Sequence, residues 1–404
     1  MNLRDDARAL SDDLVRMRRA VHRTPETGLD LPRTQEAVLT ELDGLPLEIR
    51  TGDSLSSVTA VLRGKADGPV VLLRGDMDAL PVAERTGLDF AAGNGNMHAC
   101  GHDLHTAMLT GAARLLSAHR DRLAGDVVFM FQPGEEGYDG ARHMLDEGLL
   151  AAAGRRPEAA YAIHVLSAGL PGGAFRTRGG TMMAASNVLR VTVRGEGGHG
   201  AMPYRAKDPV QAACAMVSAL QAWITRTFDI FDPVVLTVGT FHAGTKSNVI
   251  PDTAVFEATV RSFSQAAQAR VKDGTVEVCR GIAAAYGVGV DAEFAALYPV
   301  TVNDDDEAAF VGDAVREAMG EERFAPLPQP LTGAEDFSRV LAEVPGAMIF
   351  LGAPPVGADP ERSANNHSPL AEFDDAVLAD GAAMYAELAV RRLERGPAHA
   401  PAEA

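Results

Sequence analysis

Residues 126–136 read Asp-Val-Val-Phe-Met-Phe-Gln-Pro-Gly-Glu-Glu, an apolar run that leads directly into a turn and two carboxylates. The run over Asp126–Phe131 is typical of a buried strand, and Gln132-Pro133-Gly134 is typical of a turn. Similar apolar runs alternate with helical patterns along the chain, at 58–62, 70–74, 159–165 and 347–351. This alternation predicts an α/β fold with a mainly parallel sheet, whose functional groups lie at the carboxyl ends of the strands.

The middle of the chain has a different order of elements. A half-buried strand over 187–193 precedes a helix that Asp208-Pro209 would open as N-cap and first residue. The patterns that follow predict strand, strand, helix and strand, at 234–240, 253–261, 265–286 and 288–294. The order β-α-β-β-α-β is that of a ferredoxin-like α+β domain. We therefore predict such a domain at 184–298, inserted into a first domain that comprises 1–183 and 299–404.

The two ends of the chain carry no targeting signal that we recognise. Apolar residues recur at alternating spacings of four and three from Leu3 to Val21, which predicts one amphipathic helix. This segment is charged throughout, so we do not expect a signal peptide. We expect the Pro-rich stretch 396–404 to be disordered, and no apolar run is long enough for a membrane span.

Composition restricts the classes of partner and compartment. The chain has 404 residues, of which 46% are hydrophobic, as in a soluble protein of two or three domains. Its net charge of -18 argues against nucleic-acid binding, which needs a basic surface. Three scattered cysteines do not form a disulfide framework, so we expect a cytoplasmic protein.

One short run, Met97–His105, combines a thiol with three imidazoles. Thiolate and neutral imidazole are the side chains that bind zinc and similar divalent metals. Cys100 and His102 are two residues apart, so both project to the same side of an extended backbone, and we predict that both are ligands. Whether His98 is a ligand stays undecided, and we place His105 outside the ligand set. The other two cysteines, Cys214 and Cys279, lie in expected helices and are predicted to be core residues.

Further candidate ligands occur later in the chain. Glu135-Glu136 follows a strand, and isolated histidines stand at His164 and His367. One of two adjacent carboxylates can bind metal while the other takes a proton from metal-bound water. Asp76 is suited to orient a histidine ligand, and Asp78 fits that role or a structural turn equally well. These residues together predict a metallohydrolase.

Several long motifs resemble the metal-dependent aminoacylase/carboxypeptidase superfamily, in particular its amidohydrolase branch of hippurate hydrolases, N-acyl-amino-acid amidohydrolases and auxin-conjugate hydrolases. The motifs extend over most of the chain: Arg18-Arg19 with His22, RGDMDALP at 74–81, MHACGHDLHTAML at 97–109, FQPGEEGYDGA at 131–141, GGHGAMP at 197–203, SNVIPD at 247–252, GAEDFS at 333–338 and NNHSP at 365–369.

This resemblance implies roles for individual residues in a site with two divalent metal ions. Cys100 would bridge the ions, and Glu135 would be the general base. His102 and His164 would complete one metal site, and Glu136 and His367 the other. Manganese, zinc, cobalt and nickel all remain possible.

The resemblance also implies a catalytic first domain and an inserted lid domain that forms a homodimer. His199 would reach the partner's active site, while Asn248 and Arg261 would hold the substrate carboxylate, although neither residue alone indicates this. The implied reaction is hydrolysis of an N-acyl or N-aroyl amino acid. Alternatives are a dipeptidase, an N-acetyl-diaminopimelate-type deacetylase, or a non-catalytic relative that retains the fold.

Overall fold

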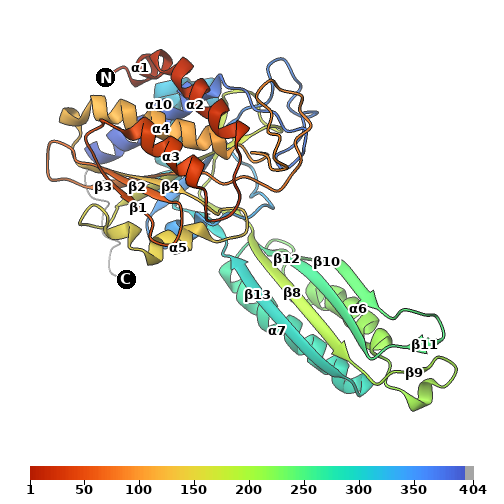
Figure 1. Cartoon of the computed structure of the whole chain (residues 1–404). Coiled ribbons are helices and arrows are strands. Elements are labelled where there is room, and N and C mark those ends of the chain that lie inside the picture. The colour runs from red at the N-terminus through yellow and green to blue at the C-terminus, as the bar shows by residue number, and fades with distance from the viewer. Residues whose placement is uncertain (396–404) are drawn as a thin grey trace, which may run out of the picture. The chain divides into compact units, whose positions relative to one another are not determined.

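The computed structural model describes residues 1–395 and divides them into two compact units. The large unit comprises Met1–Met182, Val302–Pro328 and the chain from Arg339 onward, and the small unit comprises Met183–Thr301 and Gln329–Ser338. The stretch 396–404, for which we expect disorder, lies outside the described residues. The two units are built on different sheets (Figure 1).

The large unit is built on an eight-stranded sheet in the order β1-β2-β4-β3-β5-β16-β6-β15. Its centre is parallel, because β3 pairs in parallel with β4 and β5, and β5 pairs in parallel with β16. The runs that form β2, β3, β4 and β16 are buried throughout, as in a sheet covered on both faces. The predicted mainly parallel α/β fold is confirmed. The strands are Leu47–Thr51 (β1), Val58–Leu62 (β2), Val70–Asp76 (β3), Asp126–Gln132 (β4), Ala159–Leu166 (β5), Phe175–Thr177 (β6), Phe324–Pro326 (β15) and Gly346–Gly352 (β16).

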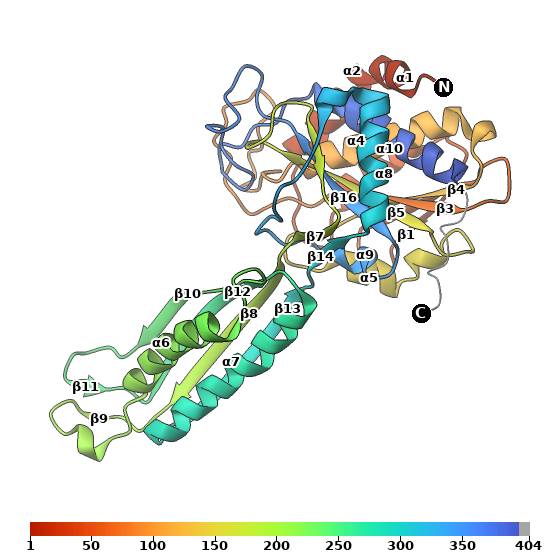
Figure 2. The same cartoon turned by 180° about the vertical axis from the view of Figure 1, so that it is seen from behind.

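Helices α4 and α10 pack against each other and against β3 (Figures 1 and 2). Both helices are buried along most of their length, which explains their Ala-rich sequences. Within residues 1–395, no helix combines the length and the apolar character that crossing a membrane requires. The helices of this unit are Leu3–Ala9 (α1), Ser11–Arg23 (α2), Pro32–Leu42 (α3), His102–Ala118 (α4), Gly140–Asp146 (α5), Asp305–Met319 (α8) and Val377–Glu394 (α10), and Ser338–Leu341 (α9) begins at the boundary of the units.

The N-terminus contains two helices where the apolar spacing predicts one. Helix α1 ends and α2 begins at Leu10, whose N–H donates to the carbonyl of Ala7 at 3.0 Å while its own carbonyl accepts from Leu14. The prediction of one continuous helix from Leu3 to Val21 is therefore wrong. The apolar stripe continues across the break and is buried on both sides of it, so its spacing carries no sign of the interruption.

A tyrosine from α10 bridges β3 and β5 at the point where their pairing ends. The last paired residues of these strands are Arg74 and Ala162. The buried hydroxyl of Tyr385 donates to the carbonyl of Arg74 at 2.6 Å and accepts from the N–H of Ile163 at 2.8 Å. The strands therefore part without leaving these backbone groups unsatisfied. Asp76 and His164 follow the point of separation.

The small unit has the β-α-β-β-α-β order that the sequence predicts. Its four strands pair antiparallel in the order β10-β12-β8-β13, and α6 and α7 cover one face of the sheet. A second, two-stranded pairing joins β9 to β11. The elements are Ala185–Arg194 (β8), Gly198–His199 (β9), Pro209–Thr227 (α6), Val234–Ala243 (β10), Val249–Ile250 (β11), Thr253–Ser262 (β12), Gln265–Tyr286 (α7) and Gly289–Tyr298 (β13). The short strands Gly180–Met183 (β7) and Thr301–Asn303 (β14) lie where the chain passes between the units.

The two helices of the small unit test the predictions for Asp208 and the two helical cysteines. Asp208 caps α6 by accepting from the N–H of Val210 at 2.8 Å, as predicted. Cys279 lies on the buried side of α7, in the core, as predicted. Cys214 is exposed, so its predicted core position is wrong. It lies off the stripe by which α6 packs on the sheet, which is formed by Ala212, Ala213, Met216, Leu220 and Ile224.

Tyr385→Phe should lower the free energy of unfolding by about 1–3 kcal/mol, because it leaves buried backbone groups of β3 and β5 without a partner. Urea unfolding followed by circular dichroism measures this change. Tyr286→Phe on α7 is the matched control, since Tyr286 is exposed, and it should change stability by less than about 0.5 kcal/mol. Equal stability of the two variants would show that the hydroxyl bridge contributes nothing.

Candidate metal centre

Cys100 belongs to two groups of possible metal ligands in the large unit. The first group is Cys100, His102 and His164, and the second is Cys100, Glu136 and His367. Within each group, one ligand atom per residue lies within 4.8 Å of the others. Nε2 of His164 lies 3.5 Å from the Cys100 sulfur, and Nε2 of His367 lies 3.3 Å from it. One sulfur is therefore within reach of both groups.

The turn before α4 places Cys100 and His102 next to each other. Gly101 has a φ of 83°, and a Cβ atom there would lie 2.4 Å from Cγ2 of Val165, so the position requires glycine. His102 is the first residue of α4. Both of its ring nitrogens are buried and lack a hydrogen-bond partner among residues 1–395, although carboxylate oxygens of Asp76 and Asp78 lie 3.5 Å away. A buried imidazole in this state fits a metal ligand.

Asp78 joins the carboxyl ends of β3 and β4. Its two oxygens accept from the N–H groups of Glu135 and Glu136, each at 3.0 Å, and the side chain is buried. The sequence left Asp78 with either an orienting role or a structural role in a turn. These two hydrogen bonds are contacts of the structural turn role. Glu136 Oε1 lies 3.1 Å from Nε2 of His367, and both glutamates form a further group of possible ligands with His102. The adjacent carboxylates are thus held beside the Cys100 groups.

His105 and Asp76 form a further group of possible ligands with His102, separate from the two Cys100 groups. Nδ1 of His105 donates to Asp76, and Nε2 accepts from the N–H of Val165 at 2.8 Å. Both ring nitrogens of His105 therefore have a hydrogen-bond partner, and its exclusion from the ligand set stays a prediction. Burial lowers the pKa of His105 to about 4. Asp76 also pairs with Arg74 at 2.7 Å, so its position beside His102 suits the predicted orienting role.

Asn366 contacts two segments of the centre, the turn at Cys100 and the end of β5, and sequence reasoning assigned it no role. Its Nδ2 donates to the carbonyls of Cys100 at 3.2 Å and Val165 at 3.1 Å, while Oδ1 accepts from the N–H of Ser167 at 2.9 Å. The next residue, His367, has a φ of 71°, a conformation uncommon outside glycine. The only sequence signal was the position of Asn366 beside His367.

The electrostatics of these groups favour cation binding. Burial raises the pKa of the Cys100 thiol, but His102 and His367 together lower it to about 6, and the thiolate is the form that binds metal. Hydrogen bonds with Cys100 and Glu136 raise the pKa of His367 to about 10. A bound cation would replace protons at this cluster, so metal uptake releases protons. The donor set therefore fits divalent metal ions.

His98, which the sequence left open, is also buried in this part of the large unit. Burial lowers its pKa to about 3, so the imidazole is neutral. Neither ring nitrogen has a hydrogen-bond partner among the described residues. It belongs to none of the groups of possible ligands found in that part of the chain.

The small unit carries the other predicted site residues at two opposite ends of its sheet. His199 pairs with Val249, and the N–H of Gly200 donates to the carbonyl of Asn248 at 2.9 Å, so His199 and Asn248 lie together. Arg261 lies near the far end of β12, opposite Ser186 and Val235. At about 3.3 Å per residue, the strand separates the two positions by roughly 25 Å. One chain therefore does not bring Arg261 and Asn248 together.

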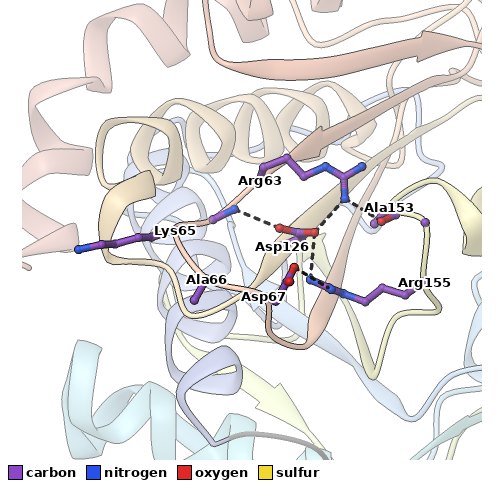
Figure 3. A pocket seen from close by; sticks show the side chains of 9 residues that line it. Arg63, Lys65, Ala66, Asp67, Asp126, Ala153 and Arg155 are labelled. Atoms are coloured by element: carbon purple, nitrogen blue, oxygen red, sulfur yellow. Dashed lines mark hydrogen bonds and ion pairs between the residues drawn. The ribbon is translucent and has the colours of Figure 1, made fainter.

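A pocket of about 550 Å³ lies at the opposite end of β4 from the glutamates (Figure 3). Arg63 and Arg155 line it around the carboxylate of Asp126, and the side chain of Lys65, also in the lining, points away from that carboxylate. Asp126 Oδ2 accepts from Arg63 at 2.9 Å and from Arg155 at 3.2 Å, as the dashed lines in Figure 3 indicate. Both guanidinium groups thus already have an anionic partner, and no candidate metal ligand lines this pocket.

Comparison with known proteins shows the family to which this chain belongs. The model of peptidase family M20/M25/M40 matches residues 72–391. The chain belongs to this family. It is therefore a metal-dependent hydrolase, and the resemblance seen in the motifs is confirmed.

Relatives cover nearly the whole of this M20 hydrolase. It is 35% identical over 396 residues to thermostable carboxypeptidase 1 of Saccharolobus solfataricus, covering 96% of this chain and 98% of that one. It is 36% identical to IAA-amino acid hydrolase ILR1-like 2 of Arabidopsis thaliana, covering 95% and 86% of the two chains. The crystal structure of the Bacillus subtilis YXEP protein, described as a dinuclear metal-binding M20 peptidase, superposes with a TM-score of 0.81 at 32% identity, covering 96% and 99%.

Cys100→Ala should lose metal from both positions of the predicted dinuclear centre, because a shared thiolate would contact both ions. His367→Ala should weaken mainly one position, since it belongs to one ligand group only. Elemental analysis after gel filtration measures the metal content of each variant. Two tightly bound ions in Cys100→Ala would contradict a bridging sulfur.

Proposed function

We propose that this M20 hydrolase cleaves the amide bond of N-acyl or N-aroyl amino acids to a carboxylic acid and a free amino acid. The observation that carries this proposal is the Cys100 sulfur within reach of two ligand groups, with Glu135 beside them. Such an arrangement suits two metal ions and one carboxylate base. The relative named as an IAA-amino acid hydrolase supports a conjugated amino acid as the substrate class.

In the proposed hydrolysis, the metal ions and the protein side chains have different roles. Two divalent ions, chosen from manganese, zinc, cobalt and nickel, would acidify a water molecule and polarise the amide carbonyl when bound by Cys100, His102, His164, Glu136 and His367. Glu135 takes a proton from the attacking water and returns it to the leaving amine. Asp78 holds the backbone of Glu135 in place for this transfer. His199 donates a hydrogen bond to the developing oxyanion.

Arg261 supports recognition of a substrate carboxylate. Its guanidinium is partly buried and forms no ion pair with any described residue, and burial lowers its pKa. A partly desolvated cation without an acidic neighbour gains strongly from an incoming carboxylate, which it can bind through two N–H donors. Asn248, which is exposed, adds a further donor.

A homodimer would bring these groups together. Arg261 and the pair His199 and Asn248 lie at opposite ends of one sheet, so one chain cannot surround one carboxylate with all three. Strand β10 is an edge strand with an unpaired side. Two-fold antiparallel pairing of β10 with the same strand of a second copy would place the Arg261 end of one sheet beside the Asn248 end of the other. We propose that the small unit forms this dimer and acts as the lid.

A second candidate function is peptide cleavage, which the carboxypeptidase relative favours. A dipeptidase and an N-acetyl-diaminopimelate-type deacetylase use the same centre. A non-catalytic role is disfavoured, because the predicted base and all predicted metal ligands are present. The three cysteines are unpaired, which favours the cytoplasm. The small-molecule substrate needs no nucleic acid or membrane partner.

The metal-loaded protein should hydrolyse acetyl-, benzoyl- and indole-acetyl-amino acids, and it should act poorly on the corresponding α-amides because Arg261 requires a carboxylate. Glu135→Gln should keep its metal and lose about 10²–10⁴-fold in kcat, since an amide cannot accept the proton. Chromatographic assay of the released amino acid, beside dipeptides, measures both effects.

Glu136→Gln is the matched control in that assay, because the same change at the neighbouring residue should release metal. If Glu135→Gln released metal and Glu136→Gln stayed loaded but inactive, the two roles would be reversed. Faster cleavage of dipeptides than of every acyl amino acid would favour the peptidase alternative.

Inactive His199→Ala and inactive Glu135→Gln subunits should regain activity when mixed under conditions that exchange dimers. The mixed dimer contains one site with both residues intact, because His199 acts in the partner's site. Native mass spectrometry confirms the exchange, and each variant mixed with itself is the control. Confirmed heterodimers without activity would place His199 in its own subunit's site or outside catalysis.

A further inference from the structure

Arg18 and His22, which belong to a motif that the proposed function does not use, converge on one buried carboxylate. Arg18 and His22 lie on α2, and Asp103 lies in the first turn of α4. Asp103 Oδ2 is 2.7 Å from Nε of Arg18 and 2.8 Å from Nδ1 of His22. The side chains of Arg18 and Asp103 are fully buried, and His22 is 1% exposed. A charged cluster is thus enclosed directly beside a metal ligand.

Further contacts hold Arg18 and His22 from their other sides. Nη1 of Arg18 is 3.1 Å from Asp375, which precedes α10, and Nε2 of His22 is 3.3 Å from Glu84. The Arg18 guanidinium also stacks over the ring of Phe90, 4.8 Å from its centroid. Each of the two side chains therefore links Asp103 to another part of the large unit.

Because Asp103 is the neighbour of His102, this cluster can affect metal binding. A buried ion pair contributes little net stability, because desolvation offsets the attraction. Asp103 follows His102 directly, so its Cα atom is about 3.8 Å from that of His102. A side chain clamped at Asp103 therefore fixes the backbone that carries the imidazole. Ligand sites require placement to within about 0.5 Å.

We propose that Arg18 and His22 are positioning residues of the metal centre, which act through Asp103 to hold His102 in its ligating position. This inference rests on the proposed dinuclear centre but not on its substrate. Helix α2 is then a part of the metal site, although none of its residues belongs to a ligand group found in the described chain.

Cobalt binding tests this assignment, because Co²⁺ bound to a thiolate gives a charge-transfer band that reports the sulfur–metal bond, and its d–d bands report the coordination geometry. Arg18→Gln should raise the dissociation constant for Co²⁺ about 10–100-fold, measured by chelator competition, and it should alter the cobalt spectrum. Arg392→Gln is the matched control. Arg392 is a similarly buried arginine, 3% exposed, that pairs with Glu307 at 2.8 Å, and Glu307 belongs to no ligand group found in the described chain. It should lower Tm while the cobalt affinity and spectrum stay those of the wild type.

If Arg18→Gln does not fold, the variants His22→Gln and Arg18→Lys can be measured in its place. His22→Gln should weaken cobalt binding in the same direction, and Arg18→Lys should restore part of the affinity by keeping the charge. Wild-type affinity and spectrum in the folded Arg18 and His22 variants would overturn the proposal, as would equal weakening by Arg392→Gln. A wild-type protein without a thiolate–cobalt band would instead contradict the metal centre. No step depends on substrate turnover, so a wrong substrate class leaves the result interpretable.

Discussion

Two hydrogen bonds from the N–H groups of Glu135 and Glu136 to the buried carboxylate of Asp78 connect the elements of the metal centre. They fasten the end of β4 to the end of β3, where the N–H of Met77 also donates to the carbonyl of Gln132. Parallel strands end at one edge of a sheet, so this fastening places both glutamates beside the histidine on β5. Asp78 thereby satisfies two backbone N–H groups of the turn that would otherwise lack partners.

The parts of the fold and site that depend on local patterns could be predicted from the sequence. Continuous apolar runs identified the central strands, because a strand covered on both faces has no polar side. The pair Cys100 and His102 could be identified because two metal-binding side chains occupy one short turn. Glu135-Glu136 could be identified because the pair follows such a strand directly. In each case the informative residues are neighbours in the chain.

The parts that depend on distant partners could not be predicted in this way. Asn366 contacts Cys100 across 266 positions, and Arg18 reaches Asp103 from another helix. An asparagine or arginine looks the same in sequence whether it binds solvent or a buried carbonyl. The break at Leu10 was missed for a related reason, since α1 and α2 present one continuous apolar stripe to the same core. Exposure of Cys214 depends on which side of α6 meets the sheet, which local propensity does not determine.

Metal binding and substrate recognition fall to different units of this chain, and the length of β12 keeps the substrate-recognition groups apart. The five proposed metal ligands (Cys100, His102, Glu136, His164 and His367) lie in the large unit, whereas Arg261, Asn248 and His199 lie in the small unit. Because β12 keeps Arg261 about 25 Å from the other two, the small unit of one chain cannot enclose a substrate carboxylate with all three groups. In the proposed dimer, metal affinity is therefore a property of the single chain, while substrate recognition is a property of the assembly. Dissociation would leave a chain that still binds its metals but holds only part of the groups that recognise the substrate.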